Sequence, residues 1–247
     1  MKSMDTLFHI YWKIQGVIAP KLLFSQDVYE NVLRSYLTPK TRWLDIGCGH
    51  RILPEWRSSE EKEIVENCKT IVGFDYDLNS LKKHKNLILK IRGDISELPF
   101  CDNSFDLVTA NMVVEHLEVP NTQFKEINRI LKSAGVFILH TPNAVGYTTI
   151  MGRLIPRAIR SKLICLFQGR KEEDIFDTYY RANSISKIRD LAKITCFEVL
   201  KIKMLVSSAQ FIIFPPLVLL ETIWIRILML EQLKKLRTNI IAILKKR

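Results

Sequence analysis

Hydrophobic residues between positions 41 and 141 come in short runs that alternate with longer amphipathic stretches. The short runs are rich in β-branched and aromatic residues, without polar alternation: 42–46, 70–74, 87–91, 105–110 and 136–140. Strands of this composition are buried on both faces, as in a parallel sheet that helices cover on each side. The alternation therefore predicts a doubly wound α/β fold with a mostly parallel sheet.

One amphipathic stretch lies between the last two of these strands and has helical spacing. Phe124, Ile127, Ile130 and Leu131 recur at intervals that place them on one face of a helix. Gly135 follows shortly after, at a position where helices commonly end. We therefore predict a helix that packs on the sheet and that Gly135 terminates.

The regular alternation ends near residue 142. Residues 145–183 are basic, contain Pro156 and predict an inserted helical segment. A further helix is expected to begin near Asn183 or Ser184, because either side chain can cap it. Residues 197–204 form another strand-like run.

These patterns divide the chain into three segments. Residues 1–40 predict an N-terminal helical segment that lies on the domain, because polar residues interrupt its apolar ones and no signal-peptide cleavage site follows. Residues 41–214 are predicted to form the main domain, in which strands alternate with helices and which includes the insertion at about 145–183. Residues 215–247 predict a C-terminal helix that is first apolar and then basic. Its later apolar stripe consists of Leu233, Leu236, Ile240 and Leu244.

The net charge of +11 is unevenly distributed. Residues 1–150 carry 18 Lys and Arg against 18 Asp and Glu, whereas residues 151–247 carry 19 against 8. The whole excess of positive charge therefore lies in the second part, which would attract a polyanion or an anionic membrane surface.

Residues 204–230 are apolar enough to suggest a membrane. A spanning helix needs about 20 mainly apolar residues, and Pro215, Pro216, Glu221 and Arg226 disfavour one here. The sequence leaves open a helix lying in an anionic membrane interface, or a helix packed on the domain or on a second subunit of a homodimer. Attraction to RNA is a third alternative, without an aromatic-plus-basic recognition motif to support it.

The five cysteines form no CxxC pair and their number is odd. This favours a reducing compartment over a disulfide framework or a zinc site. The five histidines are scattered without metal-ligand spacing, so no metal is expected. We predict a cytoplasmic protein, either free or held peripherally at the inner face of the membrane.

Acidic residues follow three successive strands, and two glycines stand beside the first. These residues are Asp45, Gly47, Gly49, Asp75 and Asp94. Glycines let a ligand approach the backbone closely, and ionised carboxylates accept hydrogen bonds from ribose hydroxyls and an adenine amino group. A dinucleotide fingerprint would need a third glycine where Ile52 stands. The pattern favours a nucleoside cofactor without phosphates, although each acid alone is also typical of a helix cap or a turn.

In order and spacing, these residues resemble class I S-adenosylmethionine-dependent methyltransferases of the type 11 domain family. The motifs that carry the resemblance are 44–49, 73–75, 93–95, 98–108, 114–116 and 131–143. The resemblance implies a Rossmann-like sheet of seven strands, with a helical insertion and a C-terminal helix. It also implies S-adenosylmethionine as the cofactor.

The resemblance further implies how the first strand end meets the cofactor. Gly47 and Gly49, with Cys48 between them, pass under its methionine part, and Asp45 helps to fix this loop and the cofactor's amino group. The family often has a glycine where this chain has Arg51. The shape of the loop beyond Gly49 is therefore left open.

The other strand ends are implied to bind the nucleoside. Asp75 takes the ribose hydroxyls and Tyr76 packs near adenine. Asp94 meets the adenine amino group, with Ile95 beside the ring. Asn111, at the end of the fourth strand, faces the methionine end.

Two histidines are candidates for a general base. His140 ends the fifth strand beside the expected cofactor site and can accept a hydroxyl proton, or it can simply hydrogen-bond a neighbouring backbone group. His116 follows the fourth strand, and we interpret it as a packing or capping residue. His140 is therefore the predicted catalytic residue.

Residues 177–183 are dense in aromatic and hydrogen-bonding groups. They resemble a motif of bacterial methyltransferases linked to surface glycan synthesis, which implies that Tyr179, Tyr180 and Arg181 line the acceptor side. A tyrosine-rich packing corner is the alternative. We predict O-methylation of a small-molecule, glycan or lipid-linked acceptor near a membrane. The other classes left open are an RNA methyltransferase and a non-catalytic membrane-associated scaffold.

Overall fold

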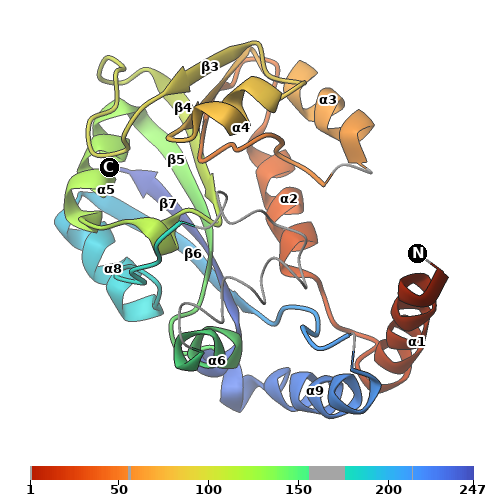
Figure 1. Cartoon of the computed structure of the whole chain (residues 1–247). Helices are drawn as coiled ribbons and strands as arrows, with labels where there is room; N and C mark the ends of the chain where they lie inside the picture. The colour runs from red at the N-terminus through yellow and green to blue at the C-terminus, as the bar shows by residue number, and fades with distance from the viewer. Residues whose placement is uncertain (1, 55–56, 156–175, 213) are drawn as a thin grey trace. The chain divides into compact units, whose positions relative to one another are not determined.

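The computed structural model describes residues 2–54, 57–155, 176–212 and 214–247 (Figure 1). The chain forms two compact units, each made of three stretches of sequence. Unit 1 comprises 1–28, 142–175 and 204–239, and unit 2 comprises 29–141, 176–203 and 240–247. Part of the predicted insertion, including Pro156, lies outside the described residues, and the predicted three-segment division stays a prediction.

Seven strands form one sheet in the order β3-β2-β1-β4-β5-β7-β6. Their bounds are β1 Arg42–Ile46, β2 Thr70–Asp75, β3 Leu89–Arg92, β4 Phe105–Asn111, β5 Leu131–Pro142, β6 Phe197–Leu205 and β7 Asn239–Lys246. The pairs from β3 through β5 are parallel, and β7 is antiparallel. The predicted mostly parallel, seven-stranded α/β sheet is confirmed.

Helices cover both faces of this sheet in unit 2. The helices α5 (Pro120–Ile130) and α8 (Ile185–Ile194) pack together on one face, while α2 (Ser25–Tyr36), α3 (Ser58–Glu66) and α4 (Leu78–Lys83) lie on the other side (Figure 1). The strand order reverses between β1 and β4, and the carboxyl ends of strands at such a switch point form the usual ligand crevice of open α/β sheets.

Two predictions about the helices of unit 2 are confirmed. Phe124, Ile127 and Ile130 are buried on one face of α5, as predicted. The Ser184 hydroxyl caps α8 by accepting the Lys187 N–H at 3.3 Å, also as predicted.

Gly135 does not end the helix, which corrects the prediction. The helix α5 ends at Ile130, and β5 already begins at Leu131. A Cβ at position 135 would lie 2.8 Å from the Lys132 carbonyl oxygen and 3.3 Å from that of Asp106. The glycine is required because backbone segments approach each other closely there.

The C-terminal segment is not one helix either. The helix α9 (Pro215–Leu228) is followed by a 3-10 helix (Glu231–Leu236) and then by β7. Residues 239–244 of β7 are all buried, which requires a strand covered on both faces rather than an amphipathic helix. The predicted stripe through Ile240 and Leu244 therefore belongs to the sheet.

Unit 1 holds α1 (Lys2–Ile18), α6 (Tyr147–Leu154) and α9. Pro215 and Pro216 occupy the first turn of α9, where proline is well tolerated, instead of interrupting a helix. Among the described helices, none is both long and apolar enough to cross a membrane.

Candidate functional site

The glycine loop at the end of β1 is held in left-handed backbone conformations. Gly47 has φ 67° and Gly49 has φ 55°. The Gly47 N–H donates to the Phe74 carbonyl at 2.7 Å, which fastens the loop to β2. A Cβ on Gly47 would overlap the Val113 side chain, whereas one on Gly49 would meet no atom within 4 Å. Gly47 is therefore fixed by contact as well as by conformation, and Gly49 leaves open space above the loop.

Asp75 joins this loop to the ends of β2 and β3. Its Oδ2 accepts the Gly49 N–H at 2.8 Å, and its Oδ1 accepts the Asp77 N–H at 2.8 Å. The Asp75 carbonyl accepts the Gly93 N–H at 3.1 Å. A carboxylate oxygen has more than one acceptor site, so both oxygens retain capacity for ribose hydroxyls.

Asp45 is buried beneath the loop and held by a hydrogen-bond chain. The Trp43 indole donates to Thr109 Oγ1 at 2.7 Å, and the Thr109 hydroxyl donates to Asp45 Oδ1 at 2.5 Å. Burial raises the pKa of Asp45 to about 7; the Thr109 hydrogen bond opposes this rise, and the charges of Asp75 and Glu61 add to it. Trp43 and Thr109 lie in two of the predicted strands, but their hydrogen bonds toward Asp45 were not predicted.

The remaining residues predicted to bind the cofactor differ in exposure. Tyr76 is 64% exposed with the Arg92 guanidinium 5.7 Å from its ring centre. Asp94 is exposed and its Oδ1 accepts the Ser96 N–H at 2.7 Å, while Ile95 is half-buried. Tyr76, Asp94 and Ile95 therefore remain open to a nucleoside.

Cys48 is different, because its thiol is buried and burial raises its pKa. A Cβ on Gly73 would come within 2.8 Å of the Cys48 sulfur. The Cys48 side chain therefore packs on β2, and only its backbone belongs to the open face of the loop.

His140 lies in the interior of unit 2 and has no exposed surface. Its Nδ1 is 2.8 Å from Asn111 Oδ1, and its ring stacks on Tyr29 with centroids 5.5 Å apart. An amide oxygen only accepts hydrogen bonds, so Nδ1 carries the proton. Burial lowers the pKa of His140 to about 3. This placement favours a role in packing and in positioning Asn111 over the predicted role as general base, because a base must reach the acceptor.

His116, unlike His140, is not enclosed in the interior of unit 2. It is half-buried, and its Nδ1 lies 2.7 Å from the Asp177 carbonyl oxygen. Because a carbonyl oxygen only accepts, Nδ1 is protonated and Nε2 carries the lone pair in the neutral ring. The interpretation of His116 from sequence as a simple packing residue overlooked this contact, which links positions 61 residues apart.

The predicted acceptor segment is fastened to the same loop after β4. The N–H groups of Tyr179 and Tyr180 donate to the Glu115 carbonyl at 2.8 and 3.1 Å. The Arg181 guanidinium donates to the Glu118 carbonyl and lies 5.2 Å from the Tyr179 ring centre. Two motifs that are far apart in sequence therefore meet beside His116.

A buried network of polar side chains lies next to the contact between the loop after β4 and the segment 177–183. The Thr141 hydroxyl donates to Glu115 Oε2 at 2.9 Å, and the Asn183 amide donates to Thr141 Oγ1 at 2.6 Å. All three side chains are at most 5% exposed. The end of β5 thus ties the loop after β4 to the start of α8.

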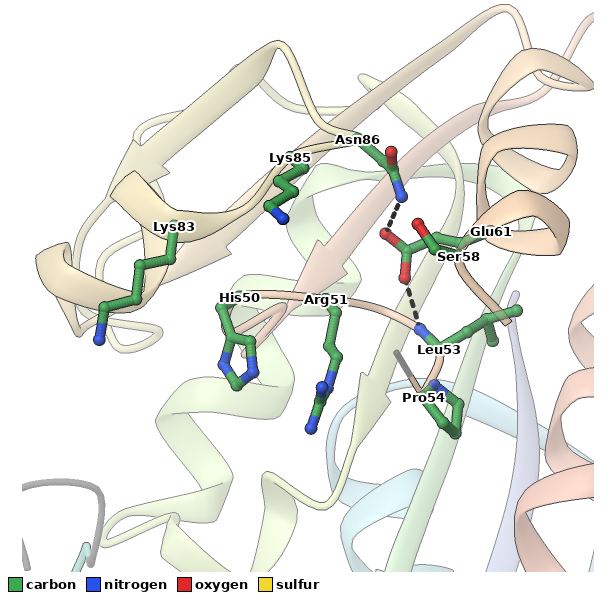
Figure 2. Close-up of a pocket in the computed structure, with 9 residues that line it drawn as sticks. All are labelled: His50, Arg51, Leu53, Pro54, Ser58, Glu61, Lys83, Lys85 and Asn86. Carbon is green, nitrogen blue, oxygen red and sulfur yellow. Dashed lines mark hydrogen bonds between the residues drawn. The ribbon is translucent and has the colours of Figure 1, made fainter. Parts of the chain in front are cut away.

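The loop beyond Gly49 is shaped by Glu61, which the sequence reasoning missed. This buried carboxylate accepts the N–H of Ile52 at 2.9 Å through Oε2. Figure 2 shows its other two hydrogen bonds, from the Leu53 N–H to Oε2 at 2.7 Å and from the Asn86 amide to Oε1 at 2.7 Å. Glu61 on α3 therefore holds the two residues that directly follow Arg51.

A cavity of about 150 Å³ lies beside this part of the loop (Figure 2). Its lining residues are His50, Arg51, Leu53, Pro54, Ser58, Glu61, Lys83, Lys85 and Asn86. None of the three strand-end acids lines it. Across the described ranges, no group of three or more His, Cys, Asp or Glu side chains is placed to hold a metal ion.

Part of the chain is similar in sequence to known proteins. Residues 44–139 match the family described as methyltransferase domain. Demethylmenaquinone methyltransferase of Staphylococcus haemolyticus is 33% identical over 101 residues, which cover 38% of this chain and 41% of that protein. The same enzyme of Staphylococcus carnosus is 31% identical over 116 residues, covering 44% and 46%. The chain thus spans less than half the length of these relatives.

Solved structures share the fold over most of the chain. An S-adenosylmethionine-dependent methyltransferase from Mesorhizobium loti has a TM-score of 0.56 at 16% identity, covering 87% of this chain and 96% of that one. A [4+2]-cyclase has a TM-score of 0.54 at 15% identity, covering 90% and 81%. The fold is therefore that of class I methyltransferases, and it also serves other chemistry.

The fold and the family match point in the same direction. Residues 44–139 are similar to the methyltransferase domain family, and the surrounding fold is that of class I methyltransferases. The methyl donor of this class is S-adenosylmethionine.

Proposed function

We propose that this protein transfers a methyl group from S-adenosylmethionine to a small-molecule acceptor. The observation that carries the proposal is that the residues following β1, β2 and β3 are joined by hydrogen bonds to Asp75. Asp75 holds the Gly49 amide and the Gly93 amide together, while Asp94 stays exposed beside them. This arrangement fits a ribose and an adenine ring on the carboxylates and a methionine part over the open side of Gly49.

For the acceptor, we propose a hydroxyl-bearing molecule of isoprenoid or lipid-linked type. Two relatives methylate demethylmenaquinone by name. The Tyr179 ring is 39% exposed and lies beside the Arg181 guanidinium, which supports binding of a flat or polar head group. A surface glycan precursor is the alternative that the motif at 177–183 favours.

The bound cofactor supplies an electrophilic methyl group on a sulfonium. Residues of the chain hold the two reactants in line, which converts a bimolecular displacement into an effectively unimolecular one. His116 Nε2 is proposed to accept the acceptor's hydroxyl proton as the oxygen–carbon bond forms and the carbon–sulfur bond breaks. The Asp177 carbonyl keeps that ring in the tautomer that can act as a base.

Calorimetry with S-adenosylhomocysteine tests the cofactor site. Wild type is expected to bind it, and Asp75→Asn is expected to bind about 10- to 100-fold more weakly, because hydrogen bonds to a charged group are lost. Asp77→Asn is the matched control, since asparagine also caps a helix and Asp77 only caps α4. Failure of wild type to bind would remove the proposal.

Substitution of His116 by asparagine tests the proposed base. Asparagine keeps an N–H donor near Nδ1 for the Asp177 carbonyl and deletes Nε2. The rate of methyl transfer is expected to fall about 10²- to 10⁴-fold, with unchanged affinity for S-adenosylhomocysteine. The measurement follows labelled methyl groups from S-adenosylmethionine into lipid-soluble and water-soluble extracts of cells, with His50→Asn as control.

The distribution of the label tests the acceptor class in the same experiment. Label in the lipid-soluble fraction supports an isoprenoid or lipid-linked acceptor. Label recovered in RNA alone would contradict a small-molecule acceptor, and an unchanged rate for His116→Asn would contradict the base.

A further inference from the structure

The segment between β3 and β4 carries two of the residues predicted to bind adenine, Asp94 and Ile95. Residues 93–104 are all described and form neither helix nor strand, and we call them the β3–β4 loop. Because such a loop has no hydrogen-bond ladder of its own, its backbone groups must find partners elsewhere in the chain or in water. Its partners within the chain therefore influence where Asp94 lies.

The Arg129 side chain of α5 makes five hydrogen bonds at this loop. Its Nη1 donates to the Phe100 carbonyl at 2.7 Å and to Asp102 Oδ1 at 2.8 Å, and its Nη2 donates to the Leu98 carbonyl at 2.9 Å. The Glu126 carboxylate accepts the other two bonds, at 2.9 Å from Nε and 2.8 Å from Nη2. A guanidinium has five donors in a fixed plane, whereas an ammonium group has three and no such fork. Lysine could not make the same set of contacts.

Glu126 also binds the loop directly. Its Oε2 accepts the Leu98 N–H at 3.0 Å, so both backbone groups of Leu98 are bound to side chains of α5. Farther along the loop, the Ser104 N–H donates to the Ile130 carbonyl at the end of α5 at 2.7 Å. The side chains and the backbone of α5 therefore hold the β3–β4 loop at two places.

A tight turn connects Asp94 to Leu98. The Asp94 carbonyl accepts the Glu97 N–H at 3.1 Å, and its Oδ1 accepts the Ser96 N–H at 2.7 Å. Leu98 follows this turn directly, and its side chain is 3% exposed. A displacement of Leu98 would therefore move the Asp94 carboxylate, because the hydrogen-bonded turn moves as a unit.

Gly93, directly before Asp94, lies against an aromatic ring that the loop also contacts. A Cβ on Gly93 would lie 2.7 Å from Cζ of Phe74, so the backbone approaches that ring closely. The Phe74 ring contacts the edge of the Phe100 ring, with centroids 6.1 Å apart. The Phe100 carbonyl is one of the acceptors of Arg129. Asp94 is therefore connected to α5 through the residues on both of its sides.

These contacts give Arg129 more influence than an isolated ion pair at the surface would have. An exposed pair of charges contributes little by itself. Two of the acceptors of Arg129, however, are backbone carbonyls of the loop, so the position of the loop depends on the guanidinium. A hydrogen bond weakens steeply when its angle or distance departs from the optimum. A small shift of Asp94 would therefore weaken its hydrogen bond with an adenine amino group.

We propose that Arg129, together with Glu126, is a positioning residue for the adenine ring of the cofactor. It acts through the β3–β4 loop, whose placement sets Asp94 and Ile95, rather than by touching the nucleoside. The inference rests on the proposed function, because it takes Asp94 as the acceptor of the adenine amino group.

Calorimetry with two ligands tests the proposal: S-adenosylhomocysteine and the analogue whose purine lacks the amino group. Wild type is expected to bind S-adenosylhomocysteine about 10- to 100-fold more tightly, because only its amino group donates to the Asp94 carboxylate. Arg129→Lys is expected to reduce this preference to about threefold or less. Arg57→Lys is the matched control, because Arg57 pairs with the carboxylates of Glu30 and Glu60 instead. It is expected to keep the wild-type preference.

The ratio of the two affinities separates positioning from stability. A purely structural role would lower the melting temperature of Arg129→Lys and leave the ratio unchanged, which would overturn the proposal. Asp94→Ala completes a double-mutant cycle: it should lose the preference by itself, and adding Arg129→Lys should not change the ratio further. A further change in that background would also contradict the proposal.

Asp102→Ala is a milder variant that decides the matter if Arg129→Lys does not fold. Asp102 is exposed and accepts one of the five hydrogen bonds of Arg129. Its removal is expected to reduce the preference about threefold, and an unchanged preference would contradict the inference. Wild type that does not bind S-adenosylhomocysteine would remove the proposed function, whereas wild type that binds it with the same preference as Arg129→Lys would remove this inference alone.

Discussion

Gly47→Ala is expected to abolish binding of S-adenosylhomocysteine and to lower the free energy of unfolding by about 2–5 kcal/mol. Two costs add here. Residue 47 has φ 67°, which costs an alanine about 1–2 kcal/mol. The new Cβ would also overlap the Val113 side chain, and overpacking of this kind costs about 1–3 kcal/mol. Urea unfolding and calorimetry measure the two effects.

Gly49→Ala is the matched control, because it shares the first cost and not the second. Its φ is 55°, and an added Cβ would meet nothing within 4 Å. We expect a loss of about 1–2 kcal/mol. Val113→Ala in the Gly47→Ala background should restore the part of the stability that the overlap removes. Equal losses for the two glycines, or no rescue by Val113→Ala, would contradict this account of the loop.

The free energy of unfolding is expected to fall by about 3 kcal/mol between pH 4 and pH 7 through Asp45 alone. The pKa of Asp45 is raised from 3.8 to about 7 in the folded chain, chiefly by burial. In that window the folded state binds one more proton than the unfolded state, so stability decreases as the pH rises. The contribution is constant below the unfolded pKa and above the folded one.

Asp45→Asn removes this titration while an amide oxygen can still accept the Thr109 hydroxyl. The difference in stability between the variant and wild type should therefore grow in favour of the variant as the pH rises from 4 to 7. Urea unfolding at several pH values measures it. A difference that does not change with pH would show that Asp45 is not the group that titrates.

The same pKa links cofactor binding to proton release. At pH 7 about half of the Asp45 carboxyls are protonated in the folded chain. The cationic amino group of the cofactor favours the ionised form, so binding near Asp45 should release about half a proton at pH 7. Calorimetry in buffers of different ionisation enthalpy measures this number, and Asp45→Asn should release none.

The sheet could be predicted from sequence because its strands are continuous apolar runs. The predicted run 42–46 coincides with β1, and the carboxyl ends of parallel strands necessarily lie along one edge. The acids that follow these strands were therefore expected near one another, and the hydrogen bonds from Gly49 and Gly93 to Asp75 connect them.

The last strand could not be recognised, because its sequence satisfies two patterns. Ile240 and Leu244 have the spacing of a helical stripe, yet the intervening residues 241–243 are apolar as well and are buried with them. Short apolar runs do not distinguish a helix from a strand by periodicity. The position of this segment beside β5 in the sheet determines that it is a strand.

The different surroundings of the two histidines could not be predicted from sequence either. His140 and His116 both follow strands, and composition says nothing of which ring is enclosed. Enclosure of His140 depends on Tyr29, which stacks on it from a distant position in the chain. The tautomer of His116 depends on the carbonyl of Asp177, which is equally remote. Long-range contacts of this kind leave no local signal.

The hydrogen bonds of Asp75 have a consequence for the rate at which ligand is captured. The Gly49 amide clamps the glycine loop to the end of β2 through a contact within the chain itself. The conformational entropy of that turn is therefore lost when the chain folds, and an incoming nucleoside does not have to order it again. Binding at this edge should resemble entry into a rigid receptor, with an association rate close to that set by diffusion and orientation.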